Sequence, residues 1–162
     1  MVAKILIVYD SKTENTEKMA FAVAEGAKQV KNMKVKVRKA AQTSLEDLQA
    51  ADGIIMGSPT YYGQMSAKLK ALIDKSVAIH GKLQGKVGAA FTSSGGTASG
   101  AETTLLSILQ AMLVHGMIIQ GRAKSKHYGT AAVGSPKQGE LKLCNELGKR
   151  TASLVIKLKT QH

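Results

Sequence analysis

The sequence predicts an α/β fold in which a parallel sheet carries helices on both of its faces. Apolar runs at residues 5–8, 53–57 and 87–92 have the length and composition of strands buried on both sides. Between these runs, apolar residues recur every three or four positions, as they do in amphipathic helices. Strands that alternate with helices form parallel βαβ units with right-handed crossovers, so we expect one doubly wound domain over residues 1–162.

The first half of the chain is expected to give three strands and three helices. The first helix ends near Lys31, because apolar residues from Met19 onward recur at helical spacing. Thr43 or Ser44 caps a short helix over 45–51, and Ser66 caps the third helix. The second strand, 34–39, alternates basic residues with valines, which is typical of an edge strand whose lysines prevent edge-to-edge aggregation.

The second half begins with the strand at 87–92 and a glycine-rich loop at 93–100. A helix over 102–115 and a short strand over 117–119 follow, and residues 122–135 are expected to be irregular. Ser135-Pro136 is predicted to open the last helix, with proline in the first turn. Cys144 falls on the buried face of that helix and is expected to be a core residue.

Composition excludes several classes of protein. The net charge is +12, but the lysines are scattered, aromatic residues make up only 4%, and no nucleic-acid-binding motif is present. There is no apolar run of membrane-spanning length, and residues 1–8 turn apolar at once and then meet Asp10, unlike a secretory signal. A single cysteine excludes an internal disulfide, and no spacing of histidines or carboxylates suggests a metal site. We therefore expect a cytoplasmic protein without bound metal.

Three unusual loops, 11–16, 58–63 and 93–100, each follow a predicted strand, and ligands of open parallel sheets lie at these carboxyl ends. The first loop offers hydroxyls and unpaired amides at a helix N-terminus, which favour a phosphate. The second offers the adjacent rings of Tyr61 and Tyr62, on which a flat ring system can stack. The third lets the main chain approach a ligand closely. A phosphate beside a flat heterocycle indicates flavin mononucleotide (FMN); the plain alternative for the first loop is a helix cap.

Other α/β sites fit less well. The phosphate loop G-x-x-x-x-G-K-[ST] is absent, and the glycines that a dinucleotide site needs after the first strand instead follow the fourth. A phospho-receiver domain needs an aspartate where this chain has Ser58-Pro59. The hydrolase motif G-x-S-x-G is missing as well.

Several segments of the chain, including Tyr128-Gly129 and Glu140-Leu141 near its end, resemble the flavodoxin-like family and, within it, the WrbA-type NAD(P)H:quinone oxidoreductases. Residues 11–20 resemble the family's phosphate loop and residues 57–65 its flavin loop, while 91–96, 102–105 and 115–117 resemble the WrbA branch. The resemblance covers nearly the whole chain. It implies a flavodoxin-like five-stranded parallel sheet of order 2-1-3-4-5, with FMN as the cofactor and NAD(P)H as a possible electron donor.

By position, the resemblance assigns three groups of cofactor-binding residues. They are Ser11, Lys12, Thr13, Glu14, Asn15 and Thr16 at the phosphate, Pro59, Thr60, Tyr61, Tyr62 and Gly63 at the ring and ribityl chain, and Ser93, Ser94, Gly95 and Gly96 at the pyrimidine side. Tyr62 and His115 would orient an electron acceptor, and His115 could donate a proton. The alternative for His115 is a cation at a helix C-terminus. Glu14 stands where the family usually has glycine, so its carboxylate must point away from the phosphate.

Two functions follow from this reading. The first is an enzyme that uses FMN and NAD(P)H to reduce a quinone by two electrons. The second is a flavodoxin-type carrier that shuttles electrons between redox proteins, although the charge of +12 argues against basic partners. A weaker third reading, supported by Glu14, is an interaction module without flavin. The resemblance also implies a homodimer or homotetramer.

Overall fold

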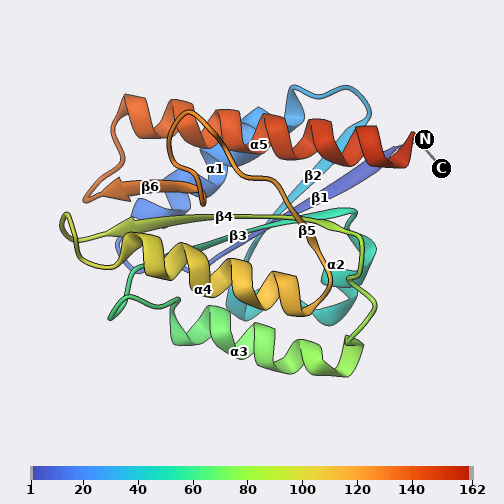
Figure 1. Cartoon of the computed structure of the whole chain (residues 1–162), viewed down its shortest axis with the longest axis horizontal. Coiled ribbons are helices and arrows are strands. Elements are labelled where there is room, and N and C mark those ends of the chain that lie inside the picture. The colour runs from blue at the N-terminus through green and yellow to red at the C-terminus, as the bar shows by residue number, and fades with distance from the viewer. Residues whose placement is uncertain (1, 161–162) are drawn as a thin grey trace.

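The computed structural model describes residues 2–160 and forms a parallel sheet between two layers of helices (Figure 1). The strand order is β2-β1-β3-β4-β5, and a further strand, β6, also pairs with β4. The strands are β1 Ala3–Tyr9, β2 Met33–Lys39, β3 Gly53–Pro59, β4 Val87–Ser94, β5 Ile118–Ile119 and β6 Thr130–Val133. The predicted fold class and strand order are confirmed.

The helices divide between the two faces of the sheet. They are α1 Asn15–Lys28, α2 Leu45–Ala50, α3 Ala67–Lys75, α4 Ala101–Val114 and α5 Gln138–Lys159, with 3₁₀ turns η1 Ala40–Gln42 and η2 Ser76–Ile79. Helices α1 and α5 cover one face, and α2, α3 and α4 cover the other (Figure 1). In β1, Ile5 and Ile7 belong to the core between the sheet and helices α1 and α5, while Leu6 and Val8 belong to the core between the sheet and helices α2, α3 and α4. Burial on both faces explains the unbroken apolar run.

Two serine caps lie where the sequence predicts them. The Ser44 hydroxyl accepts a hydrogen bond from the backbone of Asp47, and the Ser66 hydroxyl accepts one from the backbone of Leu69.

Cys144 is fully buried as predicted, and burial raises the pKa of its thiol to about 12. Within residues 2–160, no helix is both long and apolar enough to cross a bilayer.

Helices α1 and α5 touch backbone to backbone. A Cβ atom on Gly26 would lie 1.8 Å from the carbonyl oxygen of Asn145, and one on Gly148 would lie 1.9 Å from the carbonyl oxygen of Val23. Both distances are far inside van der Waals contact, so only glycine fits at these two positions. The contact sets the spacing of the helical layer that covers β1, β3 and β4.

The outer edge of β4 is paired by two short strands in series. Strand β5 pairs with Val87 and Gly88, β6 pairs with Phe91–Ser94, and residues 120–129 leave the sheet between them. The prediction that residues 122–135 are irregular is therefore wrong for Thr130–Val133, which form β6. The last helix also begins later than predicted, at Gln138 rather than at Pro136, where the Glu140 carboxylate accepts a hydrogen bond from the backbone of Lys137.

Candidate functional site

The three predicted loops meet around one cavity of about 460 Å³ at the carboxyl ends of the strands. These strand ends lie on the left of Figure 1. The volume of the cavity falls within the roughly 300–1,000 Å³ common for small-molecule sites. The lining residues are Lys12, Thr13, Asn15, Thr16, Pro59, Thr60, Tyr61, Ser93, Ser94, Gly95 and Gly134. All three loops contribute, as the sequence predicts.

The N-terminus of α1 forms one end of the cavity. Glu14 precedes the helix in a left-handed conformation, with φ 64°, and its side chain does not cap the helix. Among the described residues, none accepts a hydrogen bond from the backbone N–H of Asn15 or Thr16. Asn15 and Thr16 both line the cavity, so two amides without an acceptor and the positive end of the helix dipole lie at its edge, an arrangement that attracts a phosphate.

Hydroxyl and backbone hydrogen bonds hold the loops together. The Thr16 and Ser93 hydroxyl oxygens lie 2.8 Å apart, and both residues are buried. The Thr60 backbone N–H donates to the Ser93 carbonyl at 2.7 Å, and the Thr60 hydroxyl lies 2.9 Å from that of Thr92. These hydrogen bonds tie both the first and the second loop to Ser93 at the start of the third, and they fix the positions of the three loops around the cavity.

The second loop is a tight hairpin that rests on the start of α4. Tyr61 and Gln64 exchange two backbone hydrogen bonds of 3.1 and 3.0 Å, and Tyr62 and Gly63 between them have φ 50° and 71°. A Cβ atom on Gly100 would lie 2.5 Å from the Cα of Gly63. The turn directs Tyr61 to the cavity and leaves the Tyr62 side chain fully exposed.

Five predicted cofactor residues do not line the cavity: Ser11, Glu14, Tyr62, Gly63 and Gly96. The Ser11 hydroxyl accepts a hydrogen bond from the Glu17 backbone, and the Gly96 carbonyl accepts from the Ser94 and Ser99 hydroxyls. These residues shape the loops from outside the cavity.

Gly134, which is not among the predicted site residues, lines the cavity just after β6. Its backbone has φ 64°, and its N–H donates to the Ser94 carbonyl at 2.8 Å. A short run of small residues followed by Gly-Ser-Pro is a strand-and-turn signal that would have pointed to this position.

His115 lies at the opposite end of α4 from the cavity. The helix begins at Ala101 beside the loops and runs for 14 residues, or about 21 Å at 1.5 Å per residue, before it reaches His115. Within one chain, the structure therefore does not bring His115 together with the other predicted site residues. A catalytic contact would require His115 from a neighbouring copy.

The surroundings of His115 favour a neutral ring. The Ser76 hydroxyl donates to the Ile73 carbonyl at 2.6 Å, so it accepts from His115 Nε2, which lies 2.7 Å away. His115 Nδ1 is buried without a hydrogen-bond partner in the described chain. A second proton on this ring has no acceptor. Burial is the main cause that lowers the pKa of His115, and the charge of the nearby His80 lowers it further.

This arrangement predicts a loss of stability in mild acid. The pKa of His115 is lower in the folded chain than the value of about 6.5 expected in the unfolded chain. The unfolded state therefore binds more protons below that pH, and the free energy of unfolding falls as the pH drops. We expect urea denaturation between pH 7 and pH 5 to show a larger decrease in the free energy of unfolding for the native protein than for His115→Gln. Parallel curves for the two proteins would contradict the burial argument.

Comparison with known proteins places this site in a family. The family model for NADPH-dependent FMN reductases matches residues 21–129. An NAD(P)H dehydrogenase (quinone) of Archaeoglobus fulgidus is 38% identical over 190 residues, covering 97% of this chain and 100% of the relative. A flavodoxin of Aquifex aeolicus is 36% identical over 162 residues, covering 95% of this chain and 88% of the relative.

A solved structure agrees with these sequence matches. The WrbA-like flavodoxin from Agrobacterium tumefaciens superimposes with a TM-score of 0.82 at 28% identity, covering 96% of this chain and 98% of the other. An archaeal flavodoxin gives a TM-score of 0.77 at 30% identity, and the match covers 94% of this chain and 99% of the archaeal flavodoxin. Because sequence matches of full length agree with the strand order and the three-loop cavity, the chain belongs to the flavodoxin-like family, in its WrbA-type branch.

Proposed function

We propose that the chain is an FMN-dependent oxidoreductase that uses NAD(P)H to reduce a quinone. One observation carries the proposal: Asn15 and Thr16, whose amides have no acceptor among the described residues, line the same cavity as Tyr61 and Gly95. Bound FMN would supply the redox chemistry, and the chain would position it and its substrates.

The residues present fit FMN. Thr13, Asn15 and Thr16 would hold the phosphate, with Lys12 adding a positive charge beside it. Tyr61 would lie against the ring system, and the segment from Ser93 to Gly95 would line its other end. A Cβ atom at Gly95 would meet nothing within 4 Å, so the main chain there is open to close approach by a ligand.

Tyr62 and His115 have different places in this proposal. Tyr62, fully exposed at the hairpin tip, would contact a substrate or a second copy of the chain. His115 would act only from a neighbouring copy, which is consistent with the predicted homodimer or homotetramer. Size-exclusion chromatography with and without FMN tests that assembly, and a monomer under both conditions would remove His115 from the site.

Spectroscopic titration tests the proposed activity. We expect the purified protein to bind FMN with a shift in its visible absorbance and quenching of its fluorescence. NADPH or NADH should then bleach the absorbance rapidly, and benzoquinone should restore it. A protein that does not take up FMN would overturn the proposal.

A second candidate, a flavodoxin-type electron carrier, is favoured by the 36% identity to the Aquifex aeolicus flavodoxin. A carrier should bind FMN equally well but be bleached only slowly by NAD(P)H, while exchanging electrons rapidly with redox proteins. The rate of bleaching by NADPH therefore separates the two functions.

A further inference from the structure

The edge strand β2 leaves its outer side unpaired. It pairs with β1 in continuous register from Ala3↔Met33 to Tyr9↔Lys39, without a bulge. Its sequence, MKVKVRK, contains no proline, and no strand among the described residues lies on its other side. Backbone N–H and C=O groups along that side are therefore available to another extended chain.

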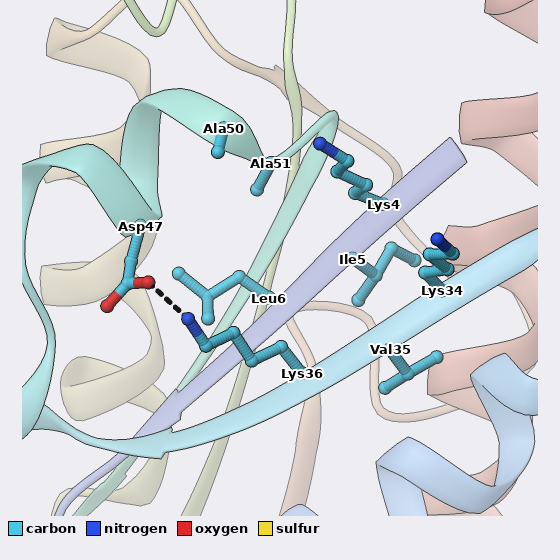
Figure 2. Close-up of a pocket in the computed structure, with 9 residues that line it drawn as sticks. All are labelled: Lys4, Ile5, Leu6, Lys34, Val35, Lys36, Asp47, Ala50 and Ala51. Carbon is cyan, nitrogen blue, oxygen red and sulfur yellow. Dashed lines mark hydrogen bonds and ion pairs between the residues drawn. The ribbon is translucent and has the colours of Figure 1, made fainter. Parts of the chain in front are cut away.

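The two faces of β2 differ in chemistry. Val35 and Val37 pack against the core beneath α1 and α5. The alternate residues Lys34, Lys36 and Arg38 lie on the opposite face, where Figure 2 shows Lys36 reaching toward Asp47 on α2. A strand added to this edge would continue both faces, so it needs apolar residues on one side and a complement to the cations on the other.

A groove of about 450 Å³ lies on the cationic face, between the β1–β2 strands and α2 (Figure 2). Lys4 and Lys34 line it as register partners on neighbouring strands. In the part of the chain that the structure describes, neither ammonium group lies within 4.0 Å of a carboxylate, although the Lys4 backbone N–H donates to the Asp52 carboxylate at 2.8 Å.

The groove has too little negative charge of its own. Asp47, its one acidic lining residue, lies 2.5 Å from the Lys36 ammonium and 3.8 Å from Arg38 Nε. Among the described residues the Lys4 and Lys34 ammonium groups therefore form no ion pair, and the Asp52 carboxylate near Lys4 is itself paired with the Lys159 ammonium at 2.8 Å, in a chain of net charge +12. Like charges placed opposite each other on neighbouring strands are destabilising, so the groove favours an anionic occupant.

The free edge and the cationic groove together define that occupant. A second copy of β2 would set lysine against lysine, which disfavours self-pairing. The unpaired backbone groups of the edge match another peptide backbone. We propose that β2 accepts an acidic β-strand from a partner protein, with carboxylates on alternate residues entering the groove at Lys4, Lys34 and Lys36.

Peptide binding tests this inference and needs no flavin. The probe is an amidated peptide with the length of β2, in which glutamate and valine alternate. In ¹⁵N-labelled protein, we expect the largest amide shifts at Met33–Lys39 and Lys4, together with slower hydrogen exchange in β2. A peptide of the same composition with its glutamates grouped at one end should bind at least tenfold more weakly. Equal binding of the two peptides would show charge attraction alone and would overturn the proposal.

Backbone methylation tests strand pairing directly. Only alternate peptide N–H groups face β2, so methylating either the valine or the glutamate nitrogens should abolish binding in one case and spare it in the other. If both methylated peptides bind as tightly as the parent, pairing is excluded.

Charge variants test the groove. Lys4→Gln/Lys34→Gln should weaken binding at least tenfold, because both side chains line the groove. The matched control, Lys142→Gln/Lys149→Gln, removes the same charge from exposed positions on α5 and should change binding less than twofold. Circular dichroism of all variants confirms folding, and equal losses in the two double variants would contradict a local site.

Discussion

Replacing Gly148 with alanine is expected to lower the free energy of unfolding by about 3 kcal/mol, at the upper end of the range for overpacked interiors. The new methyl group would lie 1.9 Å from the backbone oxygen of Val23, which no side-chain rotation can relieve. Helices α1 and α5 would have to separate, and this loss exceeds the gain of about 1 kcal/mol that alanine brings to a helix interior. Urea denaturation monitored by circular dichroism measures the change.

Gly139 provides the matched control in the same helix. A Cβ atom there meets nothing within 4 Å, so Gly139→Ala should leave stability unchanged or raise it by up to about 1 kcal/mol. A second substitution at the helix crossing, Gly26→Ala, should repeat the loss, because its Cβ would lie 1.8 Å from the Asn145 oxygen. Similar stabilities for the Gly148 and Gly139 variants would refute the close helix contact.

Replacing Glu14 with glycine is expected to raise the affinity for FMN about tenfold. Glu14 belongs to the proposed phosphate loop, immediately before the amides of Asn15 and Thr16, but its side chain is exposed and does not line the cavity. Removing one negative charge at the edge of a site for a phosphate dianion is worth about 1–2 kcal/mol in water over roughly 4–8 Å. Glycine also adopts the left-handed conformation at φ 64° without the cost that a Cβ imposes. Fluorescence titration with FMN measures the affinity.

Glu14→Gln separates the two causes. Glutamine removes the charge but keeps the strained backbone, so a gain shared by both variants reports electrostatics, and a gain confined to glycine reports strain. The electrostatic part should shrink as salt rises from 0.05 to 0.5 M, because exposed charges are screened. Weaker FMN binding by the glycine variant would show that Glu14 supports the loop instead of opposing the phosphate.

Most of the fold was predictable because local patterns and tertiary packing agree. The apolar run at residues 5–8 is buried on both faces, and Ser44 and Ser66 cap helices by ordinary local hydrogen bonds. Strand β6 was missed because Thr130–Val133 is short and made of small residues. It becomes a strand through pairing with the outer edge of β4, a long-range contact that no local pattern reports.

The candidate site was predictable as a set of loops but not as a set of side-chain positions. The rule that parallel strands end at one edge was enough to bring Thr16, Tyr61 and Ser93 together. The outward direction of Tyr62 depends on a turn with positive φ at two successive residues, Tyr62 and Gly63. Glycine is typical of such a turn but tyrosine is not, so the sequence does not predict it. His115 was grouped with the loops by resemblance, although the length of α4 separates it from them.

The contact between α1 and α5 has a consequence for synthesis on the ribosome. The apolar stripe of α1, including Met19, Val23 and Ala27, is completed as a core only by residues 138–159, which are synthesised after all the other elements that the structure describes. Until then a nascent chain carries an uncovered hydrophobic surface beside β1, a state prone to aggregation and suited to chaperone binding. Folding of this domain therefore finishes late, by closure of its final helix over its first.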